Sequence, residues 1–202
     1  ERLGFTVELA KRMSSDKLQT ILEQTWSGLA KATGQADHPW RLPALGAHGL
    51  NGPEVRTMVL RSVDPVTRQL ITQTDVRSTK VPGFRKDPRV AWHFYDPQTK
   101  VQVRANGRVT VHHDDEVTRA AWAAVPEANK RNYATPSAPG LPVDDPSLGQ
   151  AQAGAYTAAY ANFTVLSTEI TFIDWLQLGD ERHRRAQFTW TGSDWRGAWV
   201  VP

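Results

Sequence analysis

A group of cationic and hydroxyl side chains between residues 56 and 80 could bind a phosphate. Its members are Arg61, Ser78, Thr79 and Lys80. Charge-assisted donors and hydroxyls that converge on one point suit a phosphate dianion, because each supplies a hydrogen bond to a charged oxygen. The residues alone favour a blander interpretation, in which these cations lie on an amphipathic hairpin and face water.

Two predicted strands and a short helix would position this group. The run 56–61 is β-branched and apolar, which favours a strand, and Asp64-Pro65 breaks it before a second predicted strand at 68–74. Ser78 is a plausible N-cap for a helix that would begin near it. Asp87-Pro88 would end this helix, because the residue before a proline avoids the helical region.

Three motifs follow one another along the chain: R-T-M-V-L-R at 56–61, T-Q-T-D-V-R-S-T-K at 72–80 and D-P-R-V-A-W-H-F-Y at 87–95. Together they resemble the signature of the pyridoxamine 5'-phosphate oxidase-like flavoproteins. The resemblance covers most of the chain beyond about Arg41 and is strongest to the branch whose substrates are uncharacterised. It implies a split β-barrel that binds FMN at a homodimer interface.

The resemblance also implies which residues contact the flavin. The first motif would line the cofactor, with Arg61 at the FMN phosphate, and Ser78, Thr79 and Lys80 would complete the phosphate site. Gln73, Thr74 and Gln102 would lie beside the isoalloxazine ring. Trp175 and Arg185, ten positions apart, would come from the dimer partner. The expected cofactor-binding residues are Arg56, Thr57, Met58, Val59, Arg61, Gln73, Thr74, Ser78, Thr79, Lys80, Gln102, Trp175 and Arg185.

The presumed substrate segment departs from the vitamin B6 oxidases. Those enzymes carry an Arg-x-His-x-Arg run whose first Arg and His hold the substrate. Here His183 and Arg185 match, but Glu181 replaces the first Arg with the opposite charge. The segment 129–137 also lacks a clear copy of the substrate-phosphate site, although it contains Lys130, Arg131 and Ser137. We therefore expect His183 to act at the substrate, and expect weak oxidation of pyridoxamine 5'-phosphate.

Composition sets outer limits on the class of protein. The chain has 202 residues and a net charge of +3, which suits one domain with a sizeable core and an anionic ligand. It has no cysteine, which excludes disulfides, thiolate catalysis and Cys-ligated metals. No apolar run is long enough to span a bilayer, so the cytoplasm is the expected compartment. The run His112-His113-Asp114-Asp115 holds potential metal ligands, but neighbouring strand residues point to opposite faces, so no metal site is expected.

The remaining pattern predicts a mainly β fold. An amphipathic helix is expected at about 14–31, capped by Ser14, Ser15 or Asp16, and a barrel at about 41–202. A long strand at 101–112 is expected to bend at Asn106-Gly107. A Pro-, Gly- and Ser-rich segment at 134–153 reads as a mobile loop. The other expected strands lie at 41–47, 89–95, 161–170, 172–178, 186–191 and 195–201, and the other helical pieces at 114–125 and 126–133.

Six or more strands with hairpin connections and few helices predict an antiparallel split β-barrel in a single domain, residues 1–202. With the resemblance, this predicts an FMN-dependent oxidoreductase that acts as a homodimer on a small molecule, with neither nucleic acid nor a membrane as partner. Two alternatives stay open. One is a flavin-binding module without turnover, and the other is a basic barrel that binds single-stranded nucleic acid.

Overall fold

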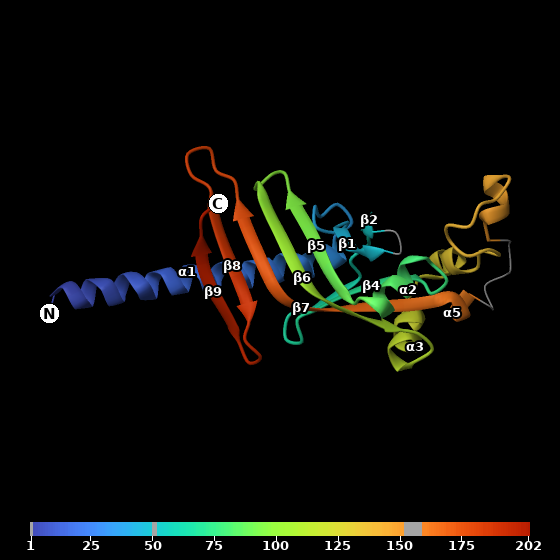
Figure 1. The fold of residues 1–202 in the computed structure, drawn as a ribbon, viewed down its shortest axis with the longest axis horizontal. Coiled ribbons are helices and arrows are strands. Elements are labelled where there is room, and N and C mark those ends of the chain that lie inside the picture. The colour runs from blue at the N-terminus through green and yellow to red at the C-terminus, as the bar shows by residue number, and fades with distance from the viewer. Residues whose placement is uncertain (1, 50–51, 152–158) are drawn as a thin grey trace.

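The computed structural model describes residues 2–49, 52–151 and 159–202, with side chains from Ser14 onward (Figure 1). The helices are α1 (Arg2–Gly34), α2 (Lys80–Lys86), α3 (Glu116–Ala123), α4 (Glu127–Lys130) and α5 (Ala159–Asn162), with 3₁₀ turns η1 (Arg131–Tyr133) and η2 (Pro146–Gly149). The strands are β1 (Ala44–Gly49), β2 (Gly52–Thr57), β3 (Ser62–Asp64), β4 (Gln69–Asp75), β5 (Arg89–Asp96), β6 (Val101–His112), β7 (Phe163–Gln177), β8 (Arg184–Trp190) and β9 (Trp195–Val200).

All nine strands form one antiparallel sheet, in the order β2-β1-β5-β6-β7-β4-β3, with β8 and β9 added on β7. The long strand β7 pairs with β8 through residues 172–177 and with β4 through residues 163–169. It therefore joins two halves of a split barrel. The mainly antiparallel fold predicted from the sequence is confirmed.

The bend between the two halves lies where the sequence predicts it. The register of β6 against β7 shifts between Asn106 and Gly107. A Cβ atom on Gly107 would lie 2.2 Å from the carbonyl oxygen of Glu169, which is far inside van der Waals contact. Only glycine lets the two backbones approach this closely, so Gly107 fixes the position of the bend.

Three predicted strands differ from the observed elements by more than small shifts at their ends. The run 56–61 is not a single strand, because β2 ends at Thr57 and the chain then changes hydrogen-bond partners. The Met58 N–H donates to the carbonyl of Pro43 at 3.0 Å, whereas the Arg61 N–H donates to Ile71 of β4 at 2.9 Å. The predicted strands 161–170 and 172–178 are one strand, β7, which continues through the bend.

Helix α1 crosses one face of the sheet, passing β9 and β8 in Figure 1. Its predicted apolar face is confirmed, since Ile21, Leu22, Trp26 and Leu29 are buried. Its predicted start at residues 14–16 is wrong, because the helix begins at Arg2. Serine and aspartate cost only tenths of a kcal/mol in a helix (about 0.7 at most), so a candidate cap inside a helix does not end it.

The two faces of the first half of the sheet differ. On β5, Trp92 and Phe94 are buried in the core beneath α1, whereas Ala91, His93 and Tyr95 on the opposite face are exposed. This opposite side of β5, β6, the second half of β7 and β8 is called the open face below. An antiparallel sheet commonly buries one face and exposes the other. Here the open face carries two of the predicted cofactor-binding residues, Gln102 and Arg185.

A smaller aromatic cluster lies at the other end of the molecule, among α3, η1 and α5. Trp122, Tyr133 and Phe163 pack with ring centroids 5.0 to 5.8 Å apart. The predicted loop at 134–153 follows this cluster and contains η2; residues 152–153 lie outside the described part, and the mobility of the loop stays a prediction. Among the described helices, none is both long and apolar enough to cross a membrane.

Candidate functional site

The turn between β4 and α2 holds three of the predicted phosphate ligands. The Ser78 N–H donates to the Asp75 carbonyl at 3.1 Å, and the Ser78 carbonyl accepts from Val81 at 2.9 Å. The predicted N-cap is wrong: α2 begins at Lys80, Thr79 precedes it, and no side chain caps the helix. The buried Ser78 hydroxyl instead accepts a 2.6 Å hydrogen bond from the Lys80 ammonium. Ser78 and Lys80 are therefore brought together, as the predicted site requires.

Arg56 on β2 supplies a second cation near Lys80. Burial lowers the pKa of Lys80 below its ordinary value, and the positive charge of Arg56 lowers it further. Arg56 is itself ion-paired with Glu54. Two cations held this close repel each other, which disfavours their charged forms. An anion bound between them would offset this repulsion. The donor set of ammonium, guanidinium and hydroxyl therefore fits a phosphate monoester.

The other residues of the first motif differ in how accessible they are. Arg61 and Thr57 are exposed, Val59 is half-buried, and the Met58 side chain is part of the core. Burial raises the pKa of Tyr133, while the positive charge of Arg61 acts in the opposite direction, which places Arg61 close to the aromatic cluster. Gln73 and Thr74 are half-buried on β4, opposite Val165 and Thr164 of β7.

Loop 134–151 is tied to the phosphate turn by Arg77, which the sequence analysis did not select. Its guanidinium binds the buried Asp75 at 2.7 and 3.0 Å. It also donates to the carbonyl and hydroxyl oxygens of Thr135 at 3.1 and 3.0 Å. The pair Asp75-x-Arg77 is visible in the sequence, but its contact with residue 135 is not.

The remaining predicted ligands lie in the other half of the sheet. Gln102 on β6 pairs with Leu176 on β7, and Leu176 pairs with Arg185 on β8. Gln102 and Arg185 therefore share one cross-strand row on the open face, two strands apart, or roughly 10 Å. Arg185 donates to Asp174 at 3.0 and 2.8 Å. Asp174 was not among the predicted residues.

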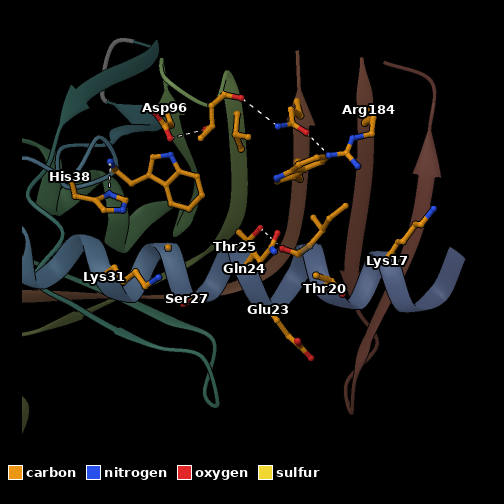
Figure 2. A pocket seen from close by; sticks show the side chains of 17 residues that line it. Lys17, Thr20, Glu23, Gln24, Thr25, Ser27, Lys31, His38, Asp96 and Arg184 are labelled. Atoms are coloured by element: carbon orange, nitrogen blue, oxygen red, sulfur yellow. Dashed lines mark hydrogen bonds between the residues drawn. The ribbon is translucent and has the colours of Figure 1, made fainter. Parts of the chain in front are cut away.

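Trp175 points to the opposite side of the sheet from Arg185. It is buried and pairs with Ala186, and the guanidinium of Arg184 lies 5.5 Å from its ring centroid. Trp175 and Arg184 line a cavity of about 800 Å³ between α1 and the sheet (Figure 2). Within one chain, Trp175 and Arg185 thus occupy one strand pair but do not share a surface.

His183 lies in the loop between β7 and β8, together with Glu181 and Arg182. The sequence analysis leaves this run between the strands expected at 172–178 and 186–191, and β8 begins two residues before the second of these, at Arg184. The His183 Nδ1 accepts a hydrogen bond from the Gly179 N–H at 3.2 Å, so a neutral ring carries its proton on Nε2. His183 and Arg185 line one cavity of about 520 Å³ with Trp199.

The candidate metal ligands have other partners. His112 Nδ1 lies 2.8 Å from Asp115 Oδ2, at the start of α3, where Asp115 is the N-cap. His113 contacts the Ala161 carbonyl at 2.9 Å. No group of three or more ligands suited to a metal ion occurs among the described residues.

The predicted ligands thus form two groups in one chain. A phosphate-side group surrounds α2 and β4, and an open-face group lies on β6 to β8. In Figure 1, α2 and β4 lie to the right of β8, and the long strands β6 and β7 run from one group toward the other. The phosphate-side group comprises Arg56, Arg61, Gln73, Thr74, Ser78, Thr79 and Lys80, and the open-face group comprises Gln102 and Arg185. His183, in the loop before β8, lines a cavity with Arg185 and with Ser14 and Lys17 of α1.

Comparison with known families and structures gives a family model over the first half of the chain and solved structures over most of it. Residues 16–113 match the family model described as "Pyridoxamine 5'-phosphate oxidase, FMN-binding domain". The match includes the phosphate-side group and Gln102, but it ends before Trp175, His183 and Arg185.

Solved structures share the fold over most of the chain. One is a pyridoxamine 5'-phosphate oxidase-related, FMN binding protein from Nostoc punctiforme PCC 73102. It is 23% identical, with 87% of this chain and 95% of that chain covered, at a TM-score of 0.70. Another is PhzG from Burkholderia lata 383, solved with tetrahydrophenazine-1-carboxylic acid. It is 18% identical, with coverage of 91% and 92%, at a TM-score of 0.68.

Proposed function

We propose that this protein is an FMN-dependent oxidoreductase resembling pyridoxamine 5'-phosphate oxidase, and that it acts on a small molecule as a homodimer. The observation that carries the proposal is the phosphate-side group, which lies inside the segment that matches an FMN-binding domain. There the Lys80 ammonium, the Ser78 hydroxyl and the nearby Arg56 provide the charge and hydrogen bonds that a phosphate monoester needs.

Each residue has a role in this proposal. Lys80, Ser78, Thr79 and Arg61 would hold the FMN phosphate, and Gln73 and Thr74 would border the ring. Bound FMN would supply the redox chemistry by accepting a hydride equivalent from the substrate. Arg185 would add positive charge beside the ring, which favours an anionic reduced flavin. His183 would donate from Nε2 to the substrate.

The separation of the two groups supports the proposed homodimer. Because the phosphate-side group and the open-face group lie apart in one chain, a complete site needs the open face of a second copy. The shared row of Gln102 and Arg185 supports a division in which both come from the open face of the same partner chain, whereas Trp175 lies on the other side of that sheet. This adds Gln102 to the residues expected from the partner.

The substrate is proposed to be neutral or cationic. Glu181 lies exposed two residues before His183, and a carboxylate there repels a phosphate or phenolate. Two like charges at ~4 Å cost about 1 kcal/mol in water and more in a closed site. We expect feeble oxidation of pyridoxamine 5'-phosphate, and Glu181→Arg should increase it. A wild-type kcat/KM near ~10⁴ M⁻¹s⁻¹ for this compound would rule out the proposed preference.

The absorption spectrum of the purified protein tests the function directly. We expect a yellow protein that releases FMN on denaturation and is bleached anaerobically by its substrate. A yellow protein that no substrate or nicotinamide reduces would indicate a flavin-binding module without turnover. A colourless protein that does not bind added FMN, but binds oligonucleotides in a salt-sensitive way, would support the nucleic-acid alternative instead.

A further inference from the structure

A fully buried carboxylate lies on the open face, beside the predicted flavin ligand Arg185. The side chain of Asp174 on β7 is 1% exposed. It accepts hydrogen bonds from Arg104 at 2.6 Å, from Arg185 at 3.0 and 2.8 Å, and from Gln187 at 2.9 Å. These three residues come from the two strands that flank β7, so the carboxylate joins β6 to β8 through side chains.

The register of the strands explains this arrangement. Arg104, Asp174 and Gln187 lie directly opposite one another in a single cross-strand row. Gln102, Leu176 and Arg185 form the next row. Arg185 therefore reaches Asp174 diagonally, and its guanidinium lies along the sheet surface rather than extending into solvent.

The burial of Asp174 comes from its partners and not from an apolar layer. Arg104 and Arg185 cover it, and their own side chains stay 48% and 26% exposed. Although burial opposes ionisation, the hydrogen bonds from Arg185, Gln187 and Arg104 prevail and lower the pKa of Asp174 to about 2. At neutral pH the cluster thus holds one anion and two cations, and the Nη1 group of Arg185 is not used by Asp174.

We propose that Asp174 is a positioning residue for the flavin: it fixes the guanidinium of Arg185 so that the N–H donors of Arg185 that Asp174 does not use face the cofactor of the partner site. The proposal rests on the proposed function, because it assumes that Arg185 contacts FMN. Without the carboxylate, two guanidinium groups would repel each other and Arg185 would regain its rotamer freedom. Ordering that side chain again would weaken binding.

A double-mutant cycle on FMN affinity tests whether Asp174 acts through Arg185. Apoprotein is titrated with FMN by flavin fluorescence for the wild type, Asp174→Asn, Arg185→Ala and the double variant. We expect Asp174→Asn to weaken FMN binding about ten- to a hundredfold in the wild-type background, the scale of a lost charge-assisted contact. In the Arg185→Ala background, the same change should leave the FMN affinity unchanged to within roughly twofold.

The matched control is Glu169→Gln. It removes the carboxylate of another arginine pair, Arg68–Glu169, which lies outside both groups. FMN affinity should not change in this variant. An Asp174→Asn effect that is absent, or equally large in both backgrounds, would overturn the positioning role and leave the proposed function intact. A wild type that binds no FMN would overturn both.

If Asp174→Asn does not fold, the wild type still provides a test. The Nε–H resonance of Arg185, assigned by its loss in Arg185→Lys, should be protected from solvent exchange in the apoprotein because it donates to Asp174. It should also shift when FMN is added. A resonance that exchanges rapidly, or that saturating FMN leaves unchanged, would contradict the proposal.

Discussion

Among single residues, Lys80 is the one on which the phosphate side depends most. Its ammonium is held by Ser78 and lies near Arg56. We expect Lys80→Ala to weaken FMN binding by about 1.5–3 kcal/mol, the range for a hydrogen bond to a charged group. Lys86→Ala is the matched control, because this exposed lysine ends the same helix without joining the site. Equal affinities of Lys80→Ala and the wild type in a fluorescence titration would remove Lys80 from the site.

The lowered pKa of Lys80 also predicts how FMN affinity depends on pH. Only the protonated ammonium pairs with phosphate, and its population falls as pH rises through its pKa. Because burial and Arg56 lower that pKa, affinity should begin to fall below the ordinary lysine value of about 10.4. Titrations at increasing pH should show this loss in the wild type and a flat profile in Lys80→Ala. The same slope in both proteins would assign the titration to another group.

Contacts that are local in sequence were the predictable part of the site. Ser78 and Lys80 are two positions apart, so their contact follows from the turn that contains them. The cluster around Asp174 could not be predicted, because Arg104 and Asp174 meet only through the register of β6 against β7. One signal for this cluster was available in the sequence. Side chains alternate between the two faces along β6, so Arg104 lies on the same face as Gln102.

At the level of elements, the phosphate turn and loop 134–151 form one unit through Arg77. Removing this side chain leaves the buried Asp75 without its ion-pair partner, and among the described residues the Arg77 backbone N–H is then the one donor that remains to its carboxylate. We expect Arg77→Ala to destabilise the protein by about 3 kcal/mol, the lower end for a broken buried ion pair. It should also expose the loop to proteolysis, because the bonds to Thr135 are lost.

The chain contains its own control for this prediction. Asp87 and Arg89 form a pair with the same spacing and nearly the same hydrogen-bond lengths, but the Arg89 side chain is 75% exposed. Arg89→Ala should cost about 1 kcal/mol or less, as for surface pairs. Urea unfolding of both variants makes the comparison. A similar loss in the free energy of unfolding for the two variants would mean that burial does not determine the strength of the Asp75–Arg77 pair.

The element bounds that were predicted well have strong local signals. Strand β6 matches its prediction at both ends, because its apolar alternation is regular and Gly107 marks its bend. The start of α1 and the continuity of β7 were missed for a common reason. Ser14, Ser15 and Asp16 resemble a helix cap, and the region near residue 171 resembles a break between strands. Tertiary packing stabilises both elements, so α1 and β7 continue past these weak local signals.

For the whole molecule, the split barrel keeps the two halves of the candidate site apart. The phosphate-side group lies around α2 and β4, and the open-face group on β6 to β8. The antiparallel barrel could be predicted from strand patterns and turn residues. The division of the ligands could not, because the pairing of β7 with both β4 and β8 determines it.

Mixing two variants that are each defective in one group tests the shared site most directly. Lys80→Ala removes the phosphate side and Arg185→Ala removes the open face, so homodimers of either variant should bind FMN poorly. After subunit exchange, about half of the dimers are mixed, and each mixed dimer has one site with both groups intact. We predict that tight FMN binding returns at about one site in four, measured by fluorescence titration of the mixture. A mixture that binds no better than its components would contradict a site shared between two chains.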